Sequence, residues 1–455
     1  MEGIKVEILQ VGIKDIAKRI RNKEISPVEI VEALLNKLDK ENKKYNAFIT
    51  IDSVKARREA KRLEKEIMDQ KVRSPLHGVP ISIKDNIHVK GVRLTNGSIV
   101  EELIPNKDAP IVQHLRANGA IIIGKTNMDE FANNIVGRNQ NFGTIKNPIH
   151  SDHVAGGSSG GSAVSVATHL SYGSIGTDTS GSVRIPASCC GVTGLKPTNG
   201  IISMEGITPL SWSLDVAGVF AKNCVDAALL FQSMTPGSTN SFLEVDSPNQ
   251  NDNFINGLRI GVFKNYFISE DEAVKQAMKQ VVDQLENNGA ILKELEIDHV
   301  EQFMEHHIPL ASTEAYYYFS QMMEDTDPSL YAESNYHFFE TGKNTTTKRY
   351  LEARQFRDKL MYTFREQFAN VDVIITPTLP ILPPTLEEFQ GDWEHLLGKM
   401  IKFTGPISMS GLPALSIPLS MSENRLSIGV QLIGDLFQEN KILSIGDWLM
   451  KSGEV

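Results

Sequence analysis

Residues 155–184 read AGGSSGGSAVSVATHLSYGSIGTDTSGSVR, and this stretch decides the fold. Two runs rich in glycine and hydroxyl side chains, at 156–162 and 176–182, enclose a segment of short apolar residues at 163–172 that predicts one buried helix. Glycine loses more backbone entropy on folding than other residues, so these runs weaken the chain locally. Flexible linkers share this composition, but linkers are rarely flanked by apolar segments. The runs therefore predict two neighbouring loops whose bare N–H groups and hydroxyls approach a small ligand.

Short apolar runs alternate with helical patterns on both sides of this stretch. The apolar runs lie at 79–83, 120–123, 201–204, 258–262, 290–295, 371–376 and 412–433. Such alternation predicts an α/β fold with a central mixed, mostly parallel β-sheet covered by helices on both faces.

The pattern of apolar residues divides the chain into two parts. Residues 1–72 predict an N-terminal helical segment packed on the core, with a capping box at Ser26–Glu29. Residues 73–455 predict a single α/β domain. Within it, 300–365 predict a helical insertion whose tyrosines, phenylalanines and methionines suit helix packing or the wall of a substrate pocket. The polar stretch 240–253 predicts a surface loop.

Composition narrows the classes of partner. The chain has 455 residues, 41% of them apolar and 22% charged, as in ordinary globular proteins. A net charge of −10 without a basic block argues against nucleic acid or an anionic membrane as the main partner. No apolar run reaches the roughly 18 residues that span a bilayer, and the first residues lack signal-peptide features. We expect no membrane association, and the oligomeric state, a homodimer included, stays open.

Cysteine usage points to the compartment. Cys189, Cys190 and Cys224 give an odd count without metal-ligand spacing, which indicates buried free thiols in a reducing compartment. We therefore expect a cytoplasmic protein that needs neither metal nor cofactor.

Two familiar motifs match the letters but not their context. Residues 119–126 satisfy the phosphate-loop pattern, but an apolar strand occupies the spacer that should expose backbone. Residues 157–161 match a nucleophile elbow centred on Ser159, but the polar segment before it carries no strand signal. Histidines follow at 299, 306 and 307, and none is singled out, so a serine–histidine hydrolase stays an alternative.

Lys84 is a better candidate base than any histidine. It ends an apolar strand and is flanked by Ile83 and Asp85, an unusual place for a solvated cation, although a surface lysine at a strand end is the simpler interpretation. Lowering a lysine pKa by about three units costs about 4 kcal/mol, which burial can supply. A neutral lysine could then activate a serine, with a second serine relaying the proton.

Together these motifs resemble those of the amidase signature family. The likeness begins with the two glycine-rich runs, the second continued to Pro186, and includes HGVP at 77–80, KDN at 84–86, GKTNMDEF at 124–131, GVTGLKPT at 191–198, SLD at 213–215 and GLPAL at 411–415. These matches cover most of residues 10–435 in the family's order. The resemblance implies the amidase signature fold and hydrolysis of a small-molecule amide at its C–N bond through an acyl-enzyme.

The resemblance also implies a role for each residue that matches. Ser182 would be the nucleophile, Ser158 a bridging serine on a cis peptide after Gly157, and Lys84 the base. Backbone N–H groups would form the oxyanion hole, from Thr179, Ser180, Gly181 and Ser182. Asp178 and Arg184 would brace the loop, with Ser159 as a weaker supporting residue. Ser180 departs from the family, where many members have glycine, and its side chain could narrow the acyl pocket.

Two alternatives stay open within the resemblance. The A subunit of glutamyl-tRNA amidotransferase shares these motifs and works with partner subunits. Its arginine-bearing segment corresponds here to the tyrosine-rich 313–319, and no acid stands among the residues 400–402 before Phe403-Thr404. These departures favour a stand-alone amidase. A non-catalytic binding protein with this fold is the second alternative.

Overall fold

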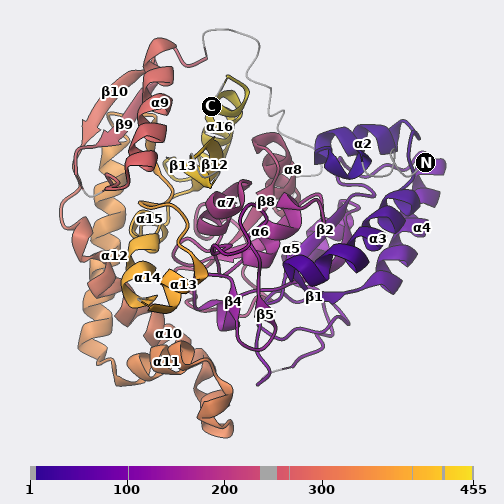
Figure 1. The fold of residues 1–455 in the computed structure, drawn as a ribbon, viewed down its shortest axis with the longest axis horizontal. Coiled ribbons are helices and arrows are strands. Elements are labelled where there is room, and N and C mark those ends of the chain that lie inside the picture. Colours follow the sequence, from indigo (N-terminus) through magenta and orange to yellow (C-terminus); the bar gives the residue numbers. More distant parts are fainter. Residues whose placement is uncertain are drawn as a thin grey trace.

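The computed structural model describes residues 7–100, 102–235, 254–265, 267–391, 393–422 and 426–452 (Figure 1). In this part of the chain, one large sheet has the strand order β1-β3-β2-β6-β8-β7-β12-β13-β11-β9-β10, and β4 and β5 form a small second sheet. The strands are β1 (Phe48–Ile51), β2 (Pro80–Lys84), β3 (Ile121–Thr126), β4 (Arg138–Asn139), β5 (Gly143–Thr144), β6 (Ser174–Asp178), β7 (Thr193–Lys196), β8 (Val216–Ala221), β9 (Arg259–Phe263), β10 (Ile291–Leu295), β11 (Val373–Pro377), β12 (Ala414–Met421) and β13 (Ser427–Ile433).

Helices surround this sheet. They are α2 (Ile13–Arg21), α3 (Pro27–Tyr45), α4 (Ser53–Met68), α5 (Pro110–Ala117), α6 (Gly160–Ala167), α7 (Arg184–Cys190), α8 (Cys224–Met234), α9 (Glu272–Asn287), α10 (Phe303–Asp325), α11 (Glu333–Asn344), α12 (Thr347–Gln367), α13 (Leu386–Gly391), α14 (Trp393–Ile401), α15 (Gly405–Ser410) and α16 (Glu439–Ser452). The predicted α/β class is confirmed, and most apolar runs are strands. The run at 201–204 is a loop.

Parallel pairing occurs in two blocks of the sheet. Strands β3, β2 and β6 are parallel to one another, as are β11, β9 and β10. Between these blocks the strands pair antiparallel. Strand β12 ends at Met421 and β13 begins at Ser427, a link too short for a parallel crossover. The sheet is mixed, as predicted, and the mostly parallel pairing holds within the two blocks only.

Helices cover both faces of the sheet, which β12 illustrates. A Cβ placed on Gly446 of α16 would meet Leu415, whereas one on Gly429, the partner of Pro418, would meet Ser188 of α7. Leu415 and Pro418 lie on opposite faces because side chains alternate along a strand. Helices α16 and α7 therefore pack on opposite faces.

Between residues 7 and 72, the N-terminal segment is helical apart from one strand and short connecting turns. Residues 48–51 form β1, which pairs antiparallel with β3 at the edge of the sheet. The helical prediction for 1–72 is wrong at this point, because Phe48 and Ile51 have a place in the sheet ladder that outweighs local helix preference. The capping box is confirmed: Ser26 Oγ accepts from Glu29 N at 3.1 Å, and Glu29 Oε2 accepts from Ser26 N at 2.9 Å.

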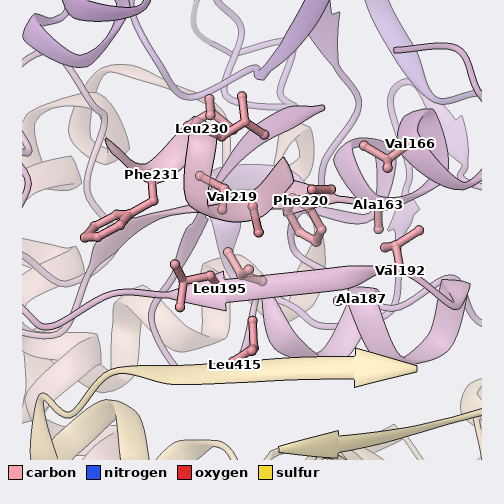
Figure 2. Close-up of a cluster of buried hydrophobic side chains, with 14 of the residues drawn as sticks. Ala163, Val166, Ala187, Val192, Leu195, Val219, Phe220, Leu230, Phe231 and Leu415 are labelled. Carbon is pink, nitrogen blue, oxygen red and sulfur yellow. The ribbon is translucent and has the colours of Figure 1, made fainter. Parts of the chain in front are cut away.

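The glycine-rich stretch lies within the core. Figure 2 shows Ala163 and Val166 of α6 in the same cluster of buried apolar side chains as Phe220 of β8 and Ala187 of α7. Helix α6 and its two flanking loops are thus held by packing from several directions. The two loops are neighbours, as predicted, because the chain returns along β6 after α6 and the Ser159 N–H donates to the Ser182 carbonyl at 3.3 Å.

Residues 300–365 are largely helical, as predicted. Helices α10 and α11 carry aromatic residues that pack on the segment after β3: Phe131 lies 4.9 Å from Phe319 and 5.8 Å from Phe339 between ring centroids. The predicted loop at 240–253 lies outside the described residues. Among the helices that the structure describes, none has both the length and the apolar character needed to cross a bilayer.

Candidate active site

Lys84 lies at the carboxyl end of β2, fully buried. Its Nζ donates to Ser158 Oγ at 2.7 Å and to Thr177 Oγ1 at 2.8 Å. The strand delivers Lys84 to this point because β2 is paired on both sides, to β3 and β6. The candidate base and the candidate bridging serine are therefore in direct contact, from positions that are 74 residues apart.

The first glycine-rich run places Ser158. The Gly157–Ser158 peptide bond is cis, and Gly156 has φ +75°. A side chain at Gly157 would collide with the carboxylate of Asp129, and one at Gly156 would meet the backbone of Pro186 at 2.7 Å. Glycine is therefore required at both positions by close approach of neighbouring groups.

The two runs are tied together by Ser159. Its backbone N–H donates to the Ser182 carbonyl at 3.3 Å, and its hydroxyl donates to the Thr177 carbonyl at 3.0 Å. Ser182 therefore lies next to the first run. The hydrogen bonds described for Ser158 and Ser182 do not include one between their hydroxyls, so the contact between bridge and nucleophile stays a prediction.

Asp178 organises the second run from the end of β6. Its carboxylate accepts from the N–H groups of Gly181 at 2.8 Å and Val183 at 3.1 Å, and from Arg184 Nη2 at 2.9 Å. Burial would raise the pKa of Asp178, but the Arg184 guanidinium holds it at about 2, so the carboxylate stays ionised. These contacts agree with the bracing role predicted for both residues.

The same contacts revise the predicted oxyanion donors. The Gly181 N–H already donates to Asp178, which removes it from the set. The hydrogen bonds in the described part of the chain give no acceptor to the N–H groups of Thr179, Ser180 and Ser182. Buried N–H groups normally have partners. Three unpaired donors on one buried loop therefore form a candidate site for a developing negative charge.

Side chains from distant segments hold this loop. Thr179 Oγ1 donates to Asp215 at 2.6 Å, and Thr404 Oγ1 donates to the Ser180 carbonyl at 2.6 Å. The hydroxyl of Ser180 lies 2.8 Å from Nε2 of His307 on α10. Helix α10 thus reaches the loop that carries Ser180 and Ser182. His307 is 6% exposed, and burial lowers its pKa to about 4, so it is neutral near pH 7.

Burial sets the protonation of the candidate base. Desolvation lowers the pKa of Lys84 to about 7. The carboxylates of Asp129, Asp215 and Asp178 act in the opposite direction, but their effect is smaller. Burial also raises the pKa of Asp129 to about 6 and that of Asp215 to about 7. A substantial share of the Lys84 side chains is therefore uncharged near neutral pH.

Sequence reasoning missed several residues of this site. Thr177, Asp129 and Asp215 lie in the motifs that carry the family resemblance, and Thr404 lies in the Phe403-Thr404 pair, but neither assigns them a role. The signal that could have found them is their place in these motifs, and only Thr177 also lies within a few positions of a predicted catalytic residue, Ser182. The contact of His307 with Ser180 joins residues 127 positions apart, and no local pattern indicates it.

The two rejected motifs have structural explanations. The spacer of the false phosphate loop is strand β3, and Lys125 within it is fully buried in an ion pair with Asp85, at 2.9 Å. Ser159, the centre of the false elbow, donates its hydroxyl to the Thr177 carbonyl and is the N-cap residue of α6.

Comparison with known proteins identifies the family. A protein-family model described as Amidase matches residues 29–443. The chain belongs to the amidase family. It is accordingly a hydrolase acting on amides, and the resemblance seen in its motifs is confirmed.

Relatives of this amidase cover nearly its whole length. The A subunit of the glutamyl-tRNA(Gln) amidotransferase of Lachnospira eligens is 33% identical, over 97% of this chain and 98% of its own. The A subunit of the same enzyme from Alkaliphilus metalliredigens is 34% identical, over 96% and 95%. Among solved structures, an amidase matches with TM-score 0.87 at 29% identity, covering 97% of this chain and 99% of that one. A 6-aminohexanoate cyclic dimer hydrolase matches with TM-score 0.88 at 26% identity, covering 98% of each.

Proposed function

We propose that this chain is a stand-alone amidase that cleaves a carboxylic amide through an acyl-enzyme. Ser182 is the nucleophile, Ser158 the bridging serine and Lys84 the base. One observation carries the proposal: the Lys84 amine, with its pKa near 7, lies 2.7 Å from the Ser158 hydroxyl. A solvated lysine would be almost entirely protonated at this pH and could accept no proton.

The reaction begins with a proton relay. Neutral Lys84 takes the proton of Ser158 as Ser158 takes that of Ser182, and Ser182 Oγ attacks the amide carbon. The negative charge that forms on the carbonyl oxygen is met by the N–H groups of Thr179, Ser180 and Ser182. The relay then returns the proton to the amine nitrogen, the C–N bond breaks, and the acyl group stays on Ser182.

Water completes the cycle. A water molecule gives a proton to the relay and attacks the ester of Ser182, so a second charged intermediate forms in the same hole. Its collapse restores the Ser182 hydroxyl and releases the carboxylic acid. Every proton moves between groups of this chain, water and substrate, so no cofactor takes part in the proposed steps.

Labelling with a fluorophosphonate tests the nucleophile. A covalent adduct on Ser182 supports the proposal, and its absence favours a non-catalytic binding protein. The same experiment tests the serine–histidine alternative, because His307 contacts Ser180 and not Ser182. Adduct formation on Ser180, abolished by Ser180→Ala and unaffected by Ser182→Ala, would overturn the assignment.

A glutaminase subunit is the second candidate, and the amidotransferase relatives favour it. The residues of this chain favour the stand-alone enzyme. The segment that corresponds to the arginine-bearing segment of the family's A subunit carries Tyr317 on α10. Tyr317 is 75% exposed, and its ring centroid lies 5.6 Å from that of Trp212. Met400 and Ile401 are buried apolar residues before Phe403. Ammonia release from a panel of aliphatic, aromatic and amino-acid amides separates the two. Activity that is limited to glutamine and depends on added partner subunits would favour the glutaminase subunit over the stand-alone amidase.

Localisation and assembly follow as further proposals. Cys189, Cys190 and Cys224 are free and buried, which supports a reducing cytoplasm. The substrate is a small-molecule amide, and the exposed aromatic pair of Trp212 and Tyr317 makes aryl amides a useful part of the panel. A homodimer stays a prediction, which gel filtration with light scattering would check.

A further inference from the structure

A turn outside the proposed active site gathers three metal-ligating side chains. His150, Asp152 and His153 each present one ligand atom, and these three atoms all lie within 4.8 Å of one another. Asp152 Oδ1 lies 3.1 Å from His153 Nδ1 and 3.6 Å from His150 Nδ1. Ligand atoms on a tetrahedral zinc ion are separated by about 3.3 Å, given bonds of about 2.0–2.1 Å. The three atoms need only small shifts to meet one ion.

Hydrogen bonds from the Asn147 side chain and between backbone groups hold this turn in shape. The amide oxygen of Asn147 accepts from Ile149 N at 2.8 Å and from His150 N at 3.3 Å. Its amide nitrogen donates to the carbonyls of Val154 at 2.9 Å and Cys189 at 3.0 Å. His153 N donates to the His150 carbonyl at 3.1 Å. The two histidines are therefore set at the two ends of one tight loop before any ligand arrives.

The turn is also attached to a second segment. His153 forms a bridge with Thr385, Leu386 N donates to the Asp152 carbonyl at 2.8 Å, and Val154 N donates to the Pro384 carbonyl at 3.0 Å. A binding site held on two sides loses little entropy when an ion orders it. This attachment distinguishes the turn from three polar residues on a flexible loop.

The donor set selects the class of ion. Two imidazoles and one carboxylate suit Zn²⁺ and its neighbours in the first transition series, whereas Mg²⁺ and Ca²⁺ require oxygen ligands. The side chains are 43%, 70% and 17% exposed for His150, Asp152 and His153, which leaves room for water to complete the coordination. His150 faces the same carboxylate as His153, and the two imidazole rings lie edge to face with their centroids 5.3 Å apart.

We propose that His150, Asp152 and His153 bind one divalent transition-metal ion, with Zn²⁺ as the preferred ion. The site ends five positions before Ser158, and it does not depend on the proposed catalytic roles. Sequence reasoning did not anticipate it, because its metal expectations rested on the cysteines.

The test is direct metal binding by the full-length, tag-free protein. Titration with Co²⁺ should produce visible absorption from one bound ion, and Zn²⁺ should displace it. His150→Ala and His153→Ala should each weaken Zn²⁺ binding at least about tenfold in calorimetry, because each removes a ligand. Zn²⁺ should also raise the melting temperature of the parent and not of the double variant.

A matched control is available on α11. His337 is exposed and lines a surface depression with Glu340, so it offers an imidazole and a carboxylate without a third ligand. His337→Ala should leave Zn²⁺ affinity unchanged. Binding that survives in the double variant, binding lost in the control, or a preference for Mg²⁺ or Ca²⁺ would overturn the proposal. Because the readout is metal affinity, amidase activity does not enter the result.

Discussion

The proposed site depends on one lysine, the proposed base, whose burial lowers its pKa to about 7. Lys84 could be selected from the sequence because an apolar strand leads directly into it. Its partners could not be selected in the same way, since Thr177 and Asp129 reach it through the packing of separate strands and loops. A pKa near 7 likewise requires knowledge of burial, which local sequence does not contain.

Removing the proposed base or the proposed nucleophile should strongly reduce turnover without unfolding the chain. We expect Lys84→Met and Ser182→Ala to lower kcat by at least about 10³-fold, as is typical of groups that act as one catalytic unit. Lys196→Met is the matched control, since Lys196 is also fully buried with a pKa lowered by burial to about 7. It should change the free energy of unfolding and leave kcat within about tenfold. Steady-state kinetics and circular dichroism measure both effects, and equal kcat losses in all three variants would contradict the assignment.

The pH dependence follows from the same amine. Only the neutral form of Lys84 can accept a proton, so kcat/KM should rise with pH through about 7 and level off above it. Asp129 and Asp215 titrate in the same range, so the rise is assigned by comparison with the residual activity of Lys84→Met, which should lack it. A rise centred near the ordinary lysine pKa of about 10.4 would contradict a buried base.

The contact between Ser180 and His307 should make the effects of substituting these two residues on kcat/KM non-additive. Ser180→Ala and His307→Phe each remove one partner of this buried hydrogen bond and leave the other partner unpaired. Each should lower the free energy of unfolding by about 1–3 kcal/mol. Each should lower kcat/KM several-fold by loosening the oxyanion loop, and the double variant should be no worse than the poorer single variant. Effects that multiply would mean that the two residues act independently.

At the scale of elements, helix α6 could be predicted, strand β6 could not, and the aromatic helices could be predicted only in part. The apolar segment 163–172 carries a strong local helix signal, although α6 ends at Ala167 and residues 168–172 form turns and bends. Residues 176–178, expected in a loop, are the end of strand β6. The reach of α10 to the loop that carries Ser180 and Ser182 depends on how α10 and α11 pack on the segment at 128–132. That packing is a long-range property of Phe131, Phe319 and Phe339.

This aromatic cluster should contribute strongly to stability. Phe339 is fully buried against Phe131 and Phe319, so Phe339→Ala should lower the free energy of unfolding by about 3–5 kcal/mol. Tyr362, 64% exposed on α12, is the control, and Tyr362→Ala should change it by no more than about 0.5 kcal/mol. Urea unfolding followed by circular dichroism measures both. A small loss in Phe339→Ala would mean that the cluster adds little to the packing of these helices.

At the scale of the whole molecule, the α/β class and the family could be read from ordered motifs, whereas the sheet could not be drawn in full. The strand order and the antiparallel centre depend on pairings such as β7 with β12, between residues separated by more than two hundred positions. The edge strand β1 was missed because four residues carry too little periodicity to outweigh their helical neighbours.

Net charge gives a prediction at this scale. With −10 charges and no basic block, the chain alone should not bind tRNA at physiological salt, because phosphate contacts need clustered lysine or arginine. A gel-shift titration with total tRNA, using a known tRNA-binding enzyme as the positive control, measures this. A shift that weakens as salt increases would contradict the prediction and support the amidotransferase candidate.

The position of β1 has a consequence for anyone who shortens this protein. Its pairing covers the outer edge of β3, so a chain that begins after residue 52 would expose a row of unpaired N–H and C=O groups. Bare edges of this kind recruit strands from other molecules. Such a truncated enzyme would precipitate or swap strands between copies, even with every catalytic group intact.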